Sequence, residues 1–289
     1  MRPFTYEYPP TLAAAIRILE AKGSAAVALA GGTDLIIGLR DGSVRPEVVV
    51  DVKGIDELET GIRATGNRLV IGARAVMEDI SRDSRVRRDF IALAEAAAVV
   101  GSVQIRNRAT LAGNICNASP AADTAPALLV YDAVVVAVGP GGERRIRIED
   151  FLVGPGVTAL AQGELVAAIE LPLPTQDRGS VSVRRTRRRG HDLASVTLAC
   201  AVLGDGNVRL AYGSVGPRPI LVIDDSGVLA DPAAPVETWM AVLDPLLAAA
   251  SPSPRSMRAS PEYRLAMLSV LALRALDSAN RRLTNGTTA

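Results

Sequence analysis

The sequence predicts an α+β fold in which a domain of two subdomains precedes a smaller domain of antiparallel sheet and helices. Roughly the first 50 residues alternate strand and helix patterns, as a small βαβ-like unit does. From Leu58 onward the pattern changes to short strands of the antiparallel kind. After a polar, Gly- and Pro-containing stretch at Leu171–Gly179, further strands are followed by two helices.

Bulk composition excludes several classes of protein. The chain has 289 residues, 48% of them hydrophobic, which is enough core material for two domains. A net charge of +1 gives no general preference for nucleic acid. Two cysteines cannot build a disulfide framework, so we expect a reducing, cytoplasmic location. We find neither a long uncharged apolar run nor the apolar core of a signal peptide, and therefore expect no membrane span and no export signal.

The first subdomain is expected over about residues 1–55. Thr11–Lys22 has apolar residues on one side and Thr11 as a plausible cap, which predicts a helix ending at Gly23. A strand from Val27 and a short helix through Arg40 follow. Glu47–Val52 completes the unit as an apolar strand.

The second subdomain is expected over about residues 56–174. The predicted strands are Gly61–Arg63, Leu69–Ile71, Ala133–Val138 and Arg144–Ile148, the last two joined by the turn at Gly139–Gly142. The predicted helical segments are Met77–Ser81, the alanine-rich Asp89–Val100 and Thr124–Tyr131.

The stretch Leu171–Gly179 is the best candidate for a domain boundary. It separates a domain at 1–174 from a second domain at 178–289. The second domain should contain strands at Ser180–Arg185, Ser195–Leu203 and Val208–Gly213, followed by helices at Val236–Ala249 and Ser260–Asn280. Ser260 and Pro261 are typical of a helix start.

Two segments rich in small residues carry the functional signal. Gly101–Pro126 shows neither helix nor strand periodicity, and irregular segments of that length are usually functional. Within it, Thr110–Asn114 would let a ligand approach backbone N–H groups. Val27–Leu35 places Gly31 and Gly32 between a strand and a helix, the usual protein arrangement for a pyrophosphate. Together the segments predict a dinucleotide cradle, although neither a Rossmann nor a P-loop spacing is present.

The motifs in these segments resemble those of a known family. Two of these motifs are A-G-G-T-D-L at Ala30–Leu35 and Q-I-R-N-R-A-T-L-A-G-N-I-x-N-A-S-P-A-A-D at Gln104–Asp123. Two more, G-S-V-G-P-R-P-I and R-A-S-P-E-Y-R-L-A-M-L, lie in the second half of the chain. They resemble the FAD-binding medium subunits of molybdenum hydroxylases, a group that includes carbon monoxide dehydrogenase and xanthine dehydrogenase. The resemblance covers nearly the whole chain and implies a two-subdomain, PCMH-type FAD-binding domain at 1–174.

The resemblance also implies which residues contact FAD. Backbone groups and the Thr33 hydroxyl should surround the pyrophosphate, and Asp123 should bind the adenosine portion, while Val166 and Arg184 should approach the isoalloxazine. Relatives often carry two glycines where this chain has Ala112 and Gly113, so an added methyl group must be tolerated. The full set implied is Leu29, Ala30, Gly31, Gly32, Thr33, Asp34, Thr110, Leu111, Ala112, Gly113, Asn114, Asp123, Val166 and Arg184.

By the same resemblance, this chain would be an electron-transfer flavoprotein subunit. A partner iron–sulfur small subunit would supply electrons from a molybdopterin large subunit, which oxidises the substrate, in a dimer of heterotrimers. FAD is the only cofactor expected on this chain, and no catalytic acid, base or metal ligand is assigned to it. Two alternatives stay open: a stand-alone FAD-dependent oxidoreductase of related fold, and a cofactor-free nucleic-acid or scaffold module.

The remaining reactive or charged residues have ordinary interpretations. The arginine run at Arg184–Arg189 lacks interleaved aromatic residues, so a solvated edge or a docking surface for an acidic partner is favoured over nucleic-acid binding. His191 is the only histidine and has no G-x-S-x-G companion, so we expect no catalytic triad. Cys116 and Cys200 cannot hold an iron–sulfur cluster, which takes four ligands, and packing is expected for both.

Overall fold

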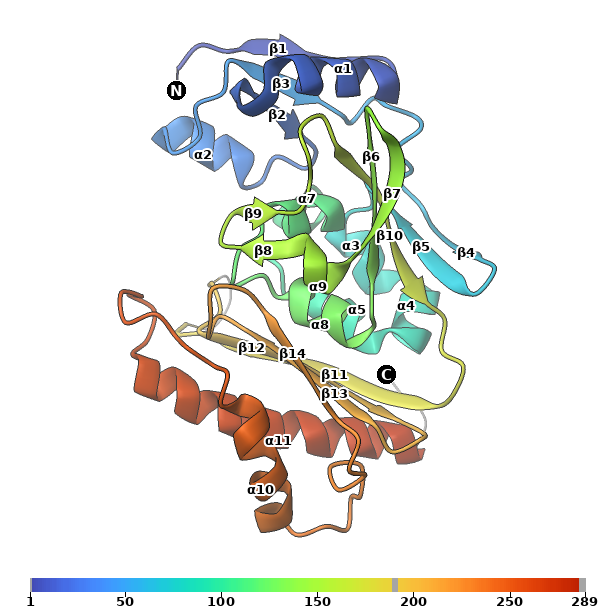
Figure 1. Cartoon of the computed structure of the whole chain (residues 1–289), viewed down its shortest axis with the longest axis vertical. Helices are drawn as coiled ribbons and strands as arrows, with labels where there is room; N and C mark the ends of the chain where they lie inside the picture. Colours follow the sequence, from blue (N-terminus) through green and yellow to red (C-terminus); the bar gives the residue numbers. More distant parts are fainter. Residues whose placement is uncertain (1, 189–191, 286–289) are drawn as a thin grey trace.

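A computed structural model describes residues 2–188 and 192–285. Within them the strands form a three-stranded sheet, β1-β3-β2, a five-stranded sheet, β4-β5-β10-β6-β7, a four-stranded sheet, β11-β12-β13-β14, and the two-stranded ribbon β8-β9. We call the first three the parallel, the middle and the C-terminal sheet. Figure 1 shows them stacked along the long axis of the molecule, with the C-terminal sheet lying on α11. The mixed helices and antiparallel sheets confirm the predicted α+β fold.

The parallel sheet and its helices form the first layer. Its elements are β1 Thr5–Glu7, α1 Leu12–Lys22, the 3-10 turn η1 Gly23–Ala25, β2 Ala26–Leu29, α2 Leu35–Asp41 and β3 Val48–Asp51. β1 and β2 both pair with β3 in parallel, so β3 is the central strand. Thr11 accepts a hydrogen bond from the Ala14 N–H and caps α1 as predicted. The carboxyl ends of these strands face the second layer, where β2 leads into Gly31 and Gly32.

The middle sheet organises the second layer. Its elements are β4 Ile62–Thr65, β5 Arg68–Gly72, α3 Met77–Arg82, α4 Ser84–Asp89, α5 Ile91–Ala98, α6 Val103–Arg106, α7 Leu111–Cys116, α8 Thr124–Val130, β6 Val134–Gly139, β7 Gly142–Arg147, α9 Ile148–Phe151, β8 Leu152–Gly154, β9 Val157–Thr158 and β10 Leu165–Pro172. β10 pairs antiparallel with both β5 and β6 and is the central strand of this sheet. The sequence patterns missed β10, although its burial is as deep as that of the predicted strands.

The segment expected to be one long irregular loop is wrong in part. Between Gly101 and Pro126 the chain forms α6 and α7, and α8 begins at Thr124. Ser102 accepts a hydrogen bond from the Ile105 N–H, and the Thr110 hydroxyl accepts one from the Gly113 N–H. These caps stabilise short helices that are too brief to show an apolar period.

A central strand of the C-terminal sheet, β12, is buried on both faces. Its layer consists of β11 Arg178–Arg185, β12 Val196–Leu203, β13 Val208–Gly213, β14 Ile220–Asp224, α10 Val236–Leu247 and α11 Pro261–Asn285. Along β12, Leu198, Cys200 and Val202 belong to the core shared with α10 and α11, whereas Ala199 and Ala201 belong to the core of the second layer. Successive strand residues point to opposite faces, so the small alanines of β12 face α8.

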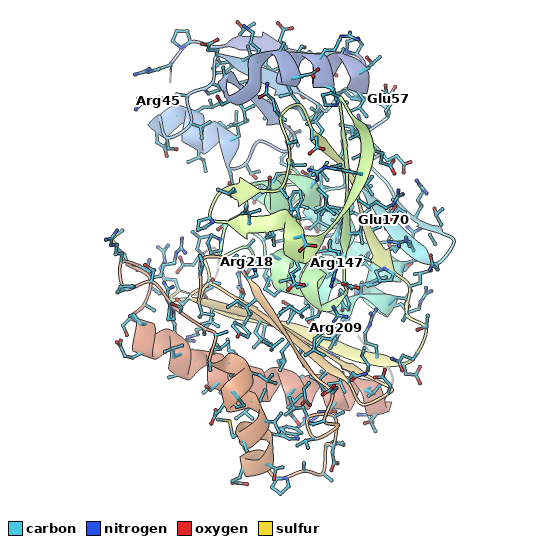
Figure 2. All side chains as sticks on the ribbon, viewed as in Figure 1. Arg45, Glu57, Arg147, Glu170, Arg209 and Arg218 are labelled. Carbon is cyan, nitrogen blue, oxygen red and sulfur yellow. The ribbon has the colours of Figure 1, made fainter. Side chains whose placement is uncertain are left out.

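Polar contacts reinforce the seam between the second layer and the C-terminal sheet. The Arg282 guanidinium contacts Glu95 at 2.6 Å, and the same glutamate accepts a hydrogen bond from the Ser182 N–H at 2.8 Å. Arg209 and Arg218, labelled in Figure 2, donate to carbonyl oxygens of the second layer, at Leu129 and Glu149. These contacts fix the C-terminal sheet and α11 relative to the second layer.

Candidate functional site

The two small-residue segments meet in space. A Cβ atom placed on Gly31 would lie 2.1 Å from the carbonyl oxygen of Arg108 and 3.0 Å from the Cα of Ala109. The turn after β2 therefore rests directly on the backbone that enters Thr110. Only glycine permits this approach, because any side chain at position 31 would overlap the Arg108 carbonyl.

The first segment offers a row of free backbone donors. Gly32 has a φ of +77°, a left-handed conformation that turns the chain from β2 into α2. Within the described residues, the N–H groups of Gly31–Asp34 have no protein acceptor, and α2 begins only at Leu35. Gly31, Gly32 and Thr33 are half-buried, whereas Asp34 is exposed. Successive N–H groups of this kind form a concave anion site.

The second segment, Thr110–Asn114, is held in place by backbone contacts with residues 75 and 76. Thr110 forms an antiparallel bridge with Val76, and the neighbouring Leu111 N–H donates to the Ala75 carbonyl. In the part of the chain that the structure describes, the Ala112 N–H at the start of α7 has no protein acceptor. Ala112 does not adopt a positive φ, so its methyl group introduces no backbone strain. A Cβ at Gly113 would contact only the Thr110 hydroxyl, at 2.9 Å.

Asn114 connects this segment to the start of α8. Its Oδ1 accepts a hydrogen bond of 2.6 Å from the Thr124 hydroxyl. Thr124 is fully buried and directly follows Asp123. The backbone around Thr110 and the carboxylate of Asp123 are thus fixed relative to one another.

Asp123 and Arg184 form an ion pair beside a hollow of about 370 Å³. The Arg184 Nη1 lies 2.8 Å from Asp123 Oδ2, and the two side chains are only 19% and 13% exposed. Asp123 Oδ1 is buried and has no partner among the described residues. Burial raises the pKa of Asp123 to about 6, although the positive charge and hydrogen bond of Arg184 oppose the shift. A carboxylate oxygen is therefore available to a ligand with a hydrogen-bond donor.

The ion pair bears on how Asp123 and Arg184 could meet a cofactor. The resemblance implies Asp123 at the adenosine end and Arg184 at the isoalloxazine end. Because the two side chains are in direct contact, a single group of a bound ligand could reach both. Val166 is elsewhere: it is 6% exposed, pairs with Ala137 beside a β-bulge, and lies in the core on β10, which contacts α7.

The hollow contains residues that the sequence patterns did not single out. Glu95, Ala98 and Val99 come from α5 and its end, and Ser182 and Val183 come from β11. Glu95 is the only charged residue in the helix I-A-L-A-E-A-A-A, and that isolation was the available signal. A lone charge in an otherwise apolar helix needs a partner, which Arg282 provides.

The arginine run is held within the molecule wherever it is described. Arg185 donates to the Tyr263 hydroxyl at 2.8 Å, Arg187 donates to the Met257 carbonyl at 3.2 Å, and Arg188 pairs with Asp192. Arg189 and His191 lie outside the described residues.

The cysteines are unsuited to ligand chemistry. Desolvation raises the pKa of Cys116 to about 12 and also raises that of Cys200. Both are free thiols, and Cys200 is fully buried in the second core. The described residues hold no group of three His, Cys, Asp or Glu side chains placed for a metal ion. None of the described helices combines the length and apolar character needed to cross a membrane.

Family models match both halves of the chain. Residues 2–174 match the FAD binding domain in molybdopterin dehydrogenase, and residues 181–279 match the CO dehydrogenase flavoprotein C-terminal domain. The chain belongs to this flavoprotein family. As an FAD subunit of the molybdenum hydroxylase family, it is part of an oxidoreductase, as its motifs predict.

Individual relatives agree over almost the full length. The FAD subunit is 33% identical over 282 residues to the xanthine dehydrogenase FAD-binding subunit of Escherichia coli O157:H7, covering 95% of each chain. It is 30% identical over 280 residues to the carbon monoxide dehydrogenase medium chain of Hydrogenophaga pseudoflava, covering 96% of each. The relatives are therefore medium chains or subunits of larger enzymes.

Solved structures show the same two-domain architecture. A carbon monoxide dehydrogenase chain from Hydrogenophaga pseudoflava superposes with a TM-score of 0.88 at 28% identity, covering 98% of this chain and 100% of that one. Quinoline 2-oxidoreductase from Pseudomonas putida 86 gives 0.85 at 25% identity, covering 97% and 98%.

The residues present fit FAD. Free N–H groups on two converging segments suit a diphosphate, and the unpartnered Asp123 Oδ1 suits a donor on the rest of the cofactor. FAD is the cofactor of this family domain, and the described residues offer no ligand set for a second, metallic one.

Proposed function

We propose that the FAD subunit binds the diphosphate of one FAD between Gly31–Asp34 and Thr110–Gly113. The contact of Gly31 with the Arg108 carbonyl is the observation that supports this most directly, because it brings the row of free N–H groups on the first segment close to the segment that carries the free Ala112 N–H. The proposed contacts retain Leu29, Ala30, Leu111 and Asn114 as the residues that shape the two segments. Val166 would act through packing, since its side chain is buried.

Asp123 and Arg184 would bind a single edge of the cofactor. One offers an unpartnered acceptor and the other is a cationic donor, and they lie 2.8 Å apart. The flavin imide, with an N–H donor flanked by carbonyl acceptors, complements this pair, and so does the adenosine portion, with its amino and hydroxyl donors and its ring-nitrogen acceptors. We therefore place one end of the FAD molecule in the hollow beside Asp123.

Bound FAD would supply electron transfer in steps of one or two electrons. The chain itself would position the cofactor, exclude water from the Asp123 side and hold that carboxylate in a set protonation state. We propose that electrons come from an iron–sulfur small subunit served by a molybdopterin large subunit, in a dimer of heterotrimers, and pass to an external acceptor. The names of the relatives, which are medium chains and FAD-binding subunits, support a multi-subunit enzyme.

We also propose a functional division at 1–174 and 178–289, with Arg184 of the second part completing the site of the first. β10 ends at Pro172 and β11 begins at Arg178, so the connection between them is short. A cytoplasmic location belongs to the same proposal, supported by two cysteines that remain free thiols.

Purification of the chain together with proteins that bind it would test the proposed function. The expected result is a yellow complex with one FAD per copy of this chain, containing one smaller cluster-bearing subunit and one larger subunit. Flavin absorbance and the masses of the co-purified chains are the measurements. A folded, colourless protein that does not bind added FAD would contradict the proposal, and steady substrate turnover by the isolated chain would favour a stand-alone oxidoreductase instead.

A further inference from the structure

A second pocket, of about 380 Å³, lies at the seam between the second layer and the C-terminal sheet. It is formed where the segment after α7, the turn between β8 and β9, the loop after β13 and the connection between α10 and α11 meet. In Figure 1 the β8–β9 ribbon and the start of α11 lie on the same side of the molecule. The pocket shares none of its lining with the proposed FAD contacts. Its volume falls within the range typical of small-molecule sites, roughly 300 to 1,000 Å³.

Two arginines without carboxylate partners line this pocket. Arg264 on α11 is only 4% exposed, and Arg258 is half-buried in the connection before that helix. Across residues 2–188 and 192–285, neither guanidinium forms an ion pair with an acidic side chain. Burial and the charge of Arg258 lower the pKa of Arg264. A buried cation without a counter-charge is costly unless a ligand supplies one.

The polar groups around Arg264 are incompletely satisfied. Its Nη1 donates to the Ser214 carbonyl at 2.8 Å and its Nη2 contacts the Ser256 hydroxyl, but its buried Nε has no partner among the described residues. The Ser214 hydroxyl is likewise buried without a partner there. Buried polar groups in native proteins are nearly always hydrogen-bonded, so two orphans in one pocket indicate a missing ligand or water.

The frame around these groups is rigid. Ser214 adopts a φ of +65°, unusual for a residue with a side chain, and its N–H donates to the Pro120 carbonyl at 2.7 Å. The Ser251 N–H donates to the Val215 carbonyl at 2.6 Å and fixes the loop that leads to Ser256 and Arg258. Strained backbone that surrounding contacts hold in place is commonly found at ligand sites.

We propose that this pocket binds a small oxyanion, a carboxylate or phosphate group of a free small molecule, between Arg258 and Arg264. Guanidinium groups donate to such oxygens in a planar fork, and the serine hydroxyls supply further donors. The site is separate from the one proposed for FAD and does not depend on it. The two sites are neighbours along the chain, because residues 119–121 line this pocket whereas Asp123 lines the hollow.

Calorimetric titration of the FAD-loaded protein as purified, using inorganic phosphate against chloride at equal ionic strength, tests this proposal. Wild-type protein should bind phosphate saturably. Arg258→Gln removes one charged donor without touching the buried hydrogen bonds of Arg264, and should weaken binding by about tenfold or more. Arg255→Gln is the matched control, because Arg255 is an exposed arginine in the same connection and does not line the pocket.

Three outcomes would overturn the proposal. One is the absence of saturable phosphate binding by the wild-type protein. Another is an equal loss of binding in the Arg255 and Arg258 variants, which would indicate general charge attraction only. The third is displacement of FAD by phosphate, which would make the pocket part of the cofactor site. Flavin absorbance that stays unchanged throughout the titration excludes displacement of FAD. This readout does not depend on which residues contact FAD.

Discussion

Gly32 and Gly42 share a backbone conformation and differ in their surroundings. Their φ angles are +77° and +79°, so an added side chain meets the same intrinsic strain at both positions, roughly 1 to 2 kcal/mol. Gly42 ends α2, and a Cβ there would approach only the Arg45 guanidinium, at 3.7 Å. Gly32 lies among the free N–H groups of the proposed phosphate site.

We expect Gly32→Ala to lower FAD affinity at least tenfold, because the methyl group would disturb the donor row and displace Leu29, whose Cδ1 would be 2.8 Å away. Gly42→Ala should lose similar stability yet retain FAD. Flavin titration by fluorescence and thermal unfolding of both variants would measure the two effects. Equal flavin affinity in the two variants would remove Gly32 from the site.

Asp123 should make FAD binding depend on pH. Its pKa of about 6 in the free protein means that the carboxylate is partly protonated below neutrality. A ligand that donates to Oδ1 prefers the ionised form and therefore lowers this pKa on binding. Affinity should then weaken as pH falls below 6, by up to about tenfold per unit, and be constant well above it.

Asp123→Asn tests this pH dependence. The amide keeps the size of the side chain but does not titrate, so the variant should bind FAD more weakly at pH 8 and with little change between pH 5 and pH 8. Dissociation constants measured at several pH values would decide the matter. A wild-type profile that is flat across pH 6 would show that the ligand does not use Oδ1.

At the scale of elements, β12 depends on small residues at one face. Ala199 is fully buried, pairs with Ser182 on β11, and belongs to the core shared with α5 and α8. Ala199→Leu would force the sheet away from α8, which packs on β12, at a cost of about 1 to 3 kcal/mol. Because Ser182 lines the hollow, FAD retention should fall as well.

Leu198→Met on the opposite face of β12 is the control for Ala199→Leu. It conserves volume and should cost less than about 1.5 kcal/mol with FAD retained. Chemical denaturation and flavin content of the two variants are the measurements. Equal losses at both positions would mean that the face of β12 toward α8 has no special role.

Sequence patterns predicted long or well-marked elements and missed those defined by tertiary contacts. Thr11–Lys22 has its own cap and apolar side, so its helix was predictable. The run Leu165–Pro172 was missed because its apolar residues do not alternate and its identity as a strand comes from pairing with β5 and β6. The short α7 was missed because it spans too few residues to show an apolar period. Its start depends on a local contact, the cap formed by the Thr110 side chain.

In the candidate site, too, features with a local sequence pattern were predictable and features that depend on tertiary contacts were not. The glycine and small-residue segments were visible in the sequence because few other residues allow such backbone turns. The pairing of Asp123 with Arg184, which are 61 residues apart, depends on how the C-terminal sheet packs against α8. No local pattern reports such a contact, so the sequence alone does not predict that the two side chains are paired.

At the scale of the whole molecule, the two halves should not function separately. A chain ending at residue 174 would expose the face of α5 and α8 that Ala199, Ala201 and Ala211 cover, and would lack Arg184. We expect this truncated chain to self-associate and to lose FAD. Size-exclusion chromatography and flavin absorbance would test this. A monomeric, yellow fragment would show that the C-terminal half is dispensable for the cofactor.

Gly31 belongs to the first layer, and the Arg108 carbonyl against which it rests belongs to the second. Any molecule held by the donors of both segments also fastens these layers to each other. The thermal stability of the protein should therefore rise with the fraction of the site that is occupied by ligand. The parallel sheet should be the part most sensitive to loss of the ligand. In such a protein the prosthetic group holds two layers of the fold together as well as carrying electrons.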